Sequence, residues 1–208
     1  YSSCTIADTI SLVGTLVQQN NANLIQQNNS LNSGTGKIIV SRDSPPLMRL
    51  DYMLWSAPVS GQFLQSFSPE TLTNRFYSYA SSSNLYVPIS NPMITNFEKG
   101  SSYLIRMPNT HPTVPTIWNG QFEGFPNNGF ISISVTPGTY NALGNPYPST
   151  IDADQFIIEN NLSEALYFWR KTNNPAASSY ATYTLAGGIG TSNSGDPLGL
   201  IPNGILQV

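Results

Sequence analysis

The sequence is poor in the residues that most often build metal centres and covalent cross-links. Cys4 is the only cysteine and His111 the only histidine among 208 residues. One cysteine excludes an internal disulfide, and a structural zinc site needs more Cys and His ligands than this chain has. His111 lies in the proline-dense segment Pro108–Pro115, where we expect a solvated loop side chain and not a rigidly held catalytic base.

Charged residues are also scarce. The chain has 8 Lys and Arg residues against 11 Asp and Glu residues, and its net charge is −3. The cations are scattered along the sequence, which excludes the clustered basic surface that nucleic acid requires. Asn, Gln, Ser and Thr must therefore solvate the surface. Such surfaces are common in exported all-β proteins and rare in cytosolic enzymes.

Long apolar runs are missing. A helix that crosses a bilayer needs about 20 apolar residues, and the longest runs here are only a handful, so we expect no membrane span. The chain begins without Met or a basic and apolar leader, and residues 204–208 are typical of a strand. We expect a mature or excised piece of a larger chain, with the neighbouring modules of that chain as its partners.

A short internal repeat stands near the N-terminus. Leu16–Asn21 recurs as Leu24–Asn29, eight positions later. Apolar pairs separated by Asn-rich corners indicate stacked β-rungs, and the alternative is an ordinary hairpin that turns near Asn20 and Asn21. We expect residues 1–40 to form short β-solenoid-like rungs or a cap.

Residues 41–208 contain short β-like runs separated by Pro, Gly and Asn, a pattern that predicts an antiparallel β-sandwich. Strict alternation makes Phe130–Val135 the clearest expected strand. One short helix is predicted from Asp152 to Asn160, with Phe156 and Ile157 facing inward. The fold class is therefore all-β. The predicted strands are Leu50–Trp55, Arg75–Tyr79, Ser102–Met107, Thr116–Trp118, Gly129–Val135, Ala165–Trp169 and Tyr180–Thr184.

Two carboxylates precede or begin that helix. Asp152 and Asp154, with the Asn145 amide and backbone carbonyls, offer the oxygen ligands that calcium takes. The alternative is that Asp152 and Asp154 cap the helix and favour its dipole. The motif lacks the acidic ladder of a calcium loop, so capping is the favoured interpretation. A structural calcium is the alternative, and no other cofactor is predicted.

Aromatic residues offer the best candidates for ligand binding. Trp55 and Trp169 lie in apolar runs and are expected in the core. Trp118 is followed by Asn119 and Gln121, so we expect its ring to be partly exposed beside two amides, an arrangement that suits a sugar. Trp118, Asn119 and Gln121 are therefore the predicted ligand-binding residues.

Enzymatic activity has weaker support. A glycoside hydrolase needs two carboxyl groups that flank one bond, and Glu123, Asp51, Asp152 and Glu159 are the available candidates. Carboxylates on a β protein need no such explanation, and there is no Gly-x-Ser-x-Gly nucleophile motif. We expect a protein that is not an enzyme.

Taken together, five segments resemble a module found near the C-terminal end of large exported surface proteins of flavobacteria and other Bacteroidota. The similarity runs from about residue 10 to the C-terminus. It implies a β-rich architecture, export by type IX secretion and a location at the cell surface or outside the cell, and it carries over no catalytic residues. The similar segments are Gly36–Arg42, Trp55–Gly61, Phe67–Tyr77, Gly100–Pro108 and Gly144–Asp154.

Three functional hypotheses follow. The favoured one is a non-enzymatic module of a secreted surface protein, which acts as a structural spacer or an adhesive unit. The second is a lectin-like module that binds surface glycans, and the least favoured is a glycoside hydrolase.

Overall fold

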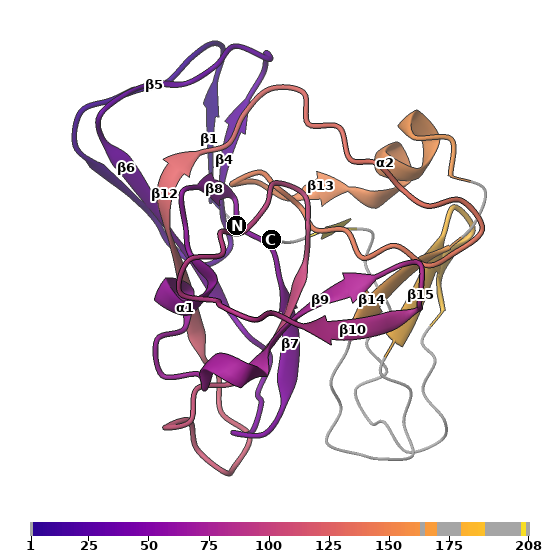
Figure 1. Ribbon diagram of the computed structural model, residues 1–208. Helices are drawn as coiled ribbons and strands as arrows, with labels where there is room; N and C mark the ends of the chain where they lie inside the picture. The colour runs from indigo at the N-terminus through magenta and orange to yellow at the C-terminus, as the bar shows by residue number, and fades with distance from the viewer. Residues whose placement is uncertain (1, 163–164, 170–179, 190–204, 207–208) are drawn as a thin grey trace. The chain divides into compact units, whose positions relative to one another are not determined.

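The computed structural model describes residues 2–162, 165–169, 180–189 and 205–206. The chain divides into two compact units, Tyr1–Ser149 and Thr150–Gln207. Strands dominate the described residues, which confirms the all-β prediction (Figure 1). They also contain two short α-helices where the sequence predicts one. No helix in these ranges is long and apolar enough to cross a membrane.

The first unit contains twelve strands and two short helical elements. In chain order these are β1 (Ser2–Ile6), β2 (Ser11–Leu12), β3 (Thr15–Gln18), β4 (Ala22–Gln26), β5 (Ser33–Gly34), β6 (Lys37–Asp43), β7 (Tyr52–Trp55), β8 (Val59–Ser60), α1 (Leu64–Phe67), the 3-10 turn Thr73–Arg75, β9 (Phe76–Ala80), β10 (Leu85–Pro88), β11 (Tyr103–Arg106) and β12 (Asn119–Pro126).

The N-terminal strands form two stacked coils. Strands β1, β2 and β3, the first coil, pair in parallel with β4, β5 and β6, the second coil. Ser2 aligns with Ala22 and Thr15 aligns with Lys37, so one coil takes 20 to 22 residues. The predicted rungs are therefore present, but the eight-residue repeat does not set their period. It marks β3 and β4, consecutive strands that are joined by a corner at Asn21, where φ is 61°.

Strand β6 joins the coils to a sheet. One edge of β6 pairs in parallel with β3, and its other edge pairs in antiparallel with β12. The resulting sheet has the order β3-β6-β12-β8, and a second sheet has the order β10-β9-β11-β7. β6 and β12 lie side by side in Figure 1. The boundary predicted between residues 40 and 41 lies within β6.

The two four-stranded sheets of the first unit contribute to one hydrophobic core, as a β-sandwich requires. Trp55 and Ile105 come from the second sheet, and Ile38 and Phe122 come from the first. Phe67 of α1 stacks on Phe122, with ring centroids 4.3 Å apart and an interplanar angle of 17°. The core therefore holds α1 against β12.

The strand predicted at Gly129–Val135 is wrong. No strand in the described part of the chain includes or pairs with these residues. Phe130 is 84% exposed, whereas Ile133 packs against Gly100. Alternation alone does not make a strand, because a strand also needs a partner for its backbone hydrogen bonds.

The strand predicted at Thr116–Trp118 is also misplaced. Thr116 makes only an isolated bridge with Leu47, and the regular strand β12 begins at Asn119.

The second unit contains β13 (Ile151–Asp152), α2 (Ala153–Glu159), β14 (Leu166–Trp169), β15 (Tyr180–Thr184), β16 (Gly187–Ile189) and β17 (Ile205–Leu206). The predicted helix and the last two predicted strands are confirmed. Ile157 of α2 is buried against Tyr183 of β15, while Phe156 is half-buried.

Candidate functional site

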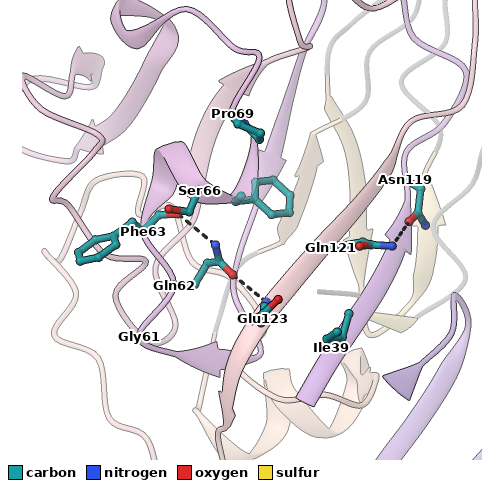
Figure 2. Close-up of a pocket in the computed structure, with 10 residues that line it drawn as sticks. Ile39, Gly61, Gln62, Phe63, Ser66, Pro69, Asn119, Gln121 and Glu123 are labelled. Atoms are coloured by element: carbon teal, nitrogen blue, oxygen red, sulfur yellow. Dashed lines mark hydrogen bonds between the residues drawn. The ribbon is translucent and has the colours of Figure 1, made fainter. Parts of the chain in front are cut away.

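The outer face of β12 supplies one wall of a groove. Asn119, Gln121 and Glu123 are exposed, and the residues between them, Gly120 and Phe122, are buried. Successive side chains of a strand point to opposite faces, so the two amides and the carboxylate form a row along one side. Figure 2 shows this row along β12, beside Ile39 of β6.

The opposite wall comes from the turn after β8 and from α1. Gly61 has a φ of 85°, a conformation that glycine adopts without steric cost, and this turn leads into Phe63 and Ser66, which line the opposite wall. In Figure 2 the ring of Phe63 points away from β12. Phe63 is partly exposed, and Pro69 lines the same wall. The groove between the walls has a volume of about 520 Å³.

Gln62 holds the two walls together. Its side chain is buried, its Oε1 accepts a 2.7 Å hydrogen bond from the Glu123 backbone N–H, and its Nε2 donates to the Phe63 carbonyl at 3.3 Å. Its own carbonyl accepts from the Phe97 N–H at 2.9 Å. The groove is therefore formed before any ligand arrives, which lowers the entropy cost of binding.

Hydrogen bonds also orient the polar row. Asn119 Nδ2 donates to Asp43 Oδ1 at 2.7 Å, and Gln121 Nε2 donates to Asn119 Oδ1 at 3.3 Å. Lys37 forms a salt bridge with Glu123, and both side chains are about half exposed. Because an amide has two N–H donors and an acceptor oxygen, this row can both donate to and accept from a hydroxyl-rich ligand.

The structure separates the three residues predicted to bind a ligand. Asn119 and Gln121 line the groove. Trp118 is half-buried against the core, edge-to-face with Trp55 at 5.5 Å and with Phe67 at 5.3 Å. The exposed aromatic residue that lines the groove is Phe63, a residue that sequence reasoning missed. The one local signal for it was Gly61, a residue of the similar segment Trp55–Gly61.

The carboxylates proposed for a glycosidase lie in different surroundings. Asp51 is buried, and its Oδ2 accepts from the Met48 N–H at 2.8 Å. Glu123 is the one carboxylate among the described residues that line the groove. Asp152 and Glu159 belong to the second unit. The groove thus lacks the pair of carboxyl groups that glycoside hydrolysis uses.

The three predicted calcium ligands all have protein partners. Asn145 is buried, and its amide accepts from the Tyr147 N–H at 2.9 Å and donates to the Ser149 carbonyl at 2.6 Å. Asp152 is the N-cap of α2, since its Oδ1 accepts from the Gln155 N–H at 2.9 Å.

Asp154, the third predicted ligand, accepts a 2.9 Å hydrogen bond from the Tyr183 hydroxyl, and this bond raises the pKa of Tyr183. The described residues contain no cluster of three or more His, Cys, Asp or Glu side chains that suits a metal. The helix-capping interpretation describes this geometry, and calcium binding stays a prediction.

A pair of substitutions separates capping from calcium binding. Asp152→Ala removes the cap and should lower the free energy of unfolding by about 1 kcal/mol. Asp152→Asn keeps an equally good cap and should change it little. Urea unfolding with calcium and with a chelator measures both variants. If the chelator destabilises the unsubstituted chain and Asp152→Asn removes that dependence, calcium is bound at this position.

His111 is not the solvated side chain that the sequence predicts. It is buried, and its Nε2 lies 2.9 Å from the Leu47 carbonyl and 3.2 Å from the Thr116 carbonyl. Because both partners are acceptors, Nε2 carries the proton. The ring therefore ties the loop before β12 to the loop after β6.

Comparison with known proteins adds a family and no activity. A family model described as Domain of unknown function (DUF8693) matches residues 1–196. No curated protein and no solved structure matches the chain.

Proposed function

Because the chain belongs to the DUF8693 family of domains of unknown function, we propose a function from its groove: a non-enzymatic module that binds a saccharide. The observation that carries the proposal is the exposed row of Asn119, Gln121 and Glu123 along one wall of a preformed groove that the exposed residue Phe63 also lines.

The chemistry of the groove fits a neutral sugar. Sugar hydroxyls need partners that donate and accept, and the two amides and Ser66 do both. The apolar face of a sugar ring needs an apolar partner, and Phe63 is the exposed aromatic residue at this groove. The volume of about 520 Å³ lies within the range of small-molecule sites. Lys37 partly neutralises Glu123, so the groove favours an uncharged ligand over a strongly anionic one.

The scarcity of carboxylates supports binding without hydrolysis. Glu123 has no second carboxylate beside it among the described groove residues, whereas glycoside hydrolysis uses a pair of carboxyl groups. We therefore expect the groove to bind and release a saccharide without cleaving it.

We also propose that the domain is exported and acts as an adhesive unit at the cell surface, beside other modules of a larger chain. The amide-rich, weakly charged composition and the resemblance to type IX secretion substrates support this. A purely structural spacer is the second candidate, and it is favoured by the shared strand β6, which connects the stacked coils to the sandwich in one sheet.

A glycan array with matched variants tests the binding proposal. We expect the labelled chain to bind a subset of neutral glycans. Gln121→Ala and Phe63→Ala should each raise the Kd about tenfold, since each removes roughly 1.4 kcal/mol of contact. Gln155→Ala is the control, because Gln155 is an exposed glutamine of α2 in the second unit, and it should leave the Kd unchanged.

Two results would refute the proposal. One is an array without binding, which would leave the spacer as the better account. The other is glycan binding that neither Gln121→Ala nor Phe63→Ala weakens, which would place the sugar site outside the groove.

A further inference from the structure

The first coil has an open end. Strands β1, β2 and β3 each use one edge to pair with the second coil, and no strand in the described ranges pairs with their other edges. An open strand edge presents backbone N–H and C=O groups to any further strand. Three such edges lie together, since the three strands belong to one coil.

Two positions of the first coil are more exposed than the residues aligned with them in the second coil. Leu24 of the second coil is 5% exposed, whereas Cys4, the residue aligned with it, is exposed. Ile38 is fully buried, whereas its aligned partner Leu16 is 37% exposed. Aligned residues of parallel strands point to the same face. Cys4 and Leu16 therefore face the coil interior and are exposed because nothing stacks above them.

Glycines give an independent indication. A Cβ added to Gly36 of the second coil would lie 2.2 Å from the Gly14 carbonyl oxygen of the first coil, so the two coils approach too closely there for any side chain. The register of β3 and β6 makes Gly14 the counterpart of Gly36. A Cβ added to Gly14 would meet nothing within 4 Å. Gly14 thus repeats, in the first coil, the glycine that close stacking requires at position 36.

We propose that the open end of the first coil is a docking surface for one further parallel β-coil, which stacks on β1, β2 and β3 as these stack on β4, β5 and β6. The existing interface between the coils defines this occupant. It has a period of 20 to 22 residues, a parallel register, apolar side chains above Cys4 and Leu16, and a close backbone approach above Gly14.

A chain with an added coil tests the proposal. Residues 2–21 are repeated in tandem ahead of Ser2, with serine in place of the cysteine in the added copy. The original Cys4 is then the only thiol, and its rate of alkylation by iodoacetamide follows its exposure. We expect that rate to fall about tenfold or more. The melting temperature should rise by about 4 °C, because each stacked repeat adds an interface.

Gly14→Ala in the original copy is the matched variant. In the chain without the added coil it should leave the alkylation rate and the melting temperature unchanged, because the space above Gly14 is open. In the chain with the added coil it should restore rapid alkylation of Cys4.

Three outcomes would overturn the proposal. The first is an alkylation rate that is the same with and without the added coil. The second is an added coil that protects Cys4 equally when residue 14 is alanine. The third is protection of Cys4 in the original chain that rises with protein concentration together with a dimer in sedimentation, which would assign the open end to a second copy of the chain.

Discussion

Replacing Phe122 by alanine should cost the first unit about 3 to 5 kcal/mol of its free energy of unfolding. Phe122 is fully buried, stacks on Phe67 at 4.3 Å, and meets Phe97 at 5.5 Å and Trp55 at 6.1 Å. The substitution removes these ring contacts and leaves a cavity between the two sheets. Denaturant unfolding followed by tryptophan fluorescence measures the loss, since Trp55 reports on the same core.

Phe130→Ala is the matched control. It deletes the same side chain from a position that is 84% exposed, so the free energy of unfolding should change by no more than about 0.5 kcal/mol. Equal losses for the two variants would mean that Phe122 does not anchor the core in the way its contacts indicate.

Gly36→Ala should lower the free energy of unfolding nearly as much as Phe122→Ala. The added Cβ would lie 2.2 Å from the carbonyl oxygen and 2.9 Å from the nitrogen of Gly14, and backbone atoms cannot move aside as a side chain can. The coils must separate locally, and the expected loss in the free energy of unfolding is about 3 kcal/mol. Denaturant unfolding gives the loss, and hydrogen exchange should place the loosened amides in β3 and β6.

Gly14→Ala makes the same chemical change in the first coil, where the space is open. Its free energy of unfolding should stay within about 0.5 kcal/mol of the original value. A tolerated alanine at both positions would show that the coils stack less closely than described.

Local sequence patterns predicted the elements that are determined by their own residues, such as a helix with a capping side chain and an apolar face. Asp152 caps α2 and Ile157 faces inward, as the sequence indicates. β12 was misplaced because two of its inward positions are Gly120 and Gly124, which lack an apolar side chain. Glycine is needed at both positions, because Phe67 lies too close to residue 120, and the Ser60 backbone too close to residue 124, to leave room for a Cβ. This requirement arises from the tertiary structure, so no local sequence pattern reveals it.

The candidate site was predicted in part for a related reason. Adjacent residues of a strand point to opposite faces, so a chain that exposes Asn119 and Gln121 on one face turns Trp118 toward the core. The sequence therefore contained the information that separates Trp118 from the two amides. Phe63 could not be predicted, because only the folded chain brings the turn after β8 opposite β12.

The shared strand β6 matters for the nascent chain as well. The ribosome makes β3 shortly before β6, but β12 follows only after the whole second sheet has been made, a delay of several seconds at normal rates of synthesis. During that time one edge of β6 waits without its partner, and its Ile38–Val40 run has the composition that promotes aggregation. Lys37 and Asp43 stand at its two ends, both exposed. Their charges discourage strands of other chains from joining that edge before β12 arrives.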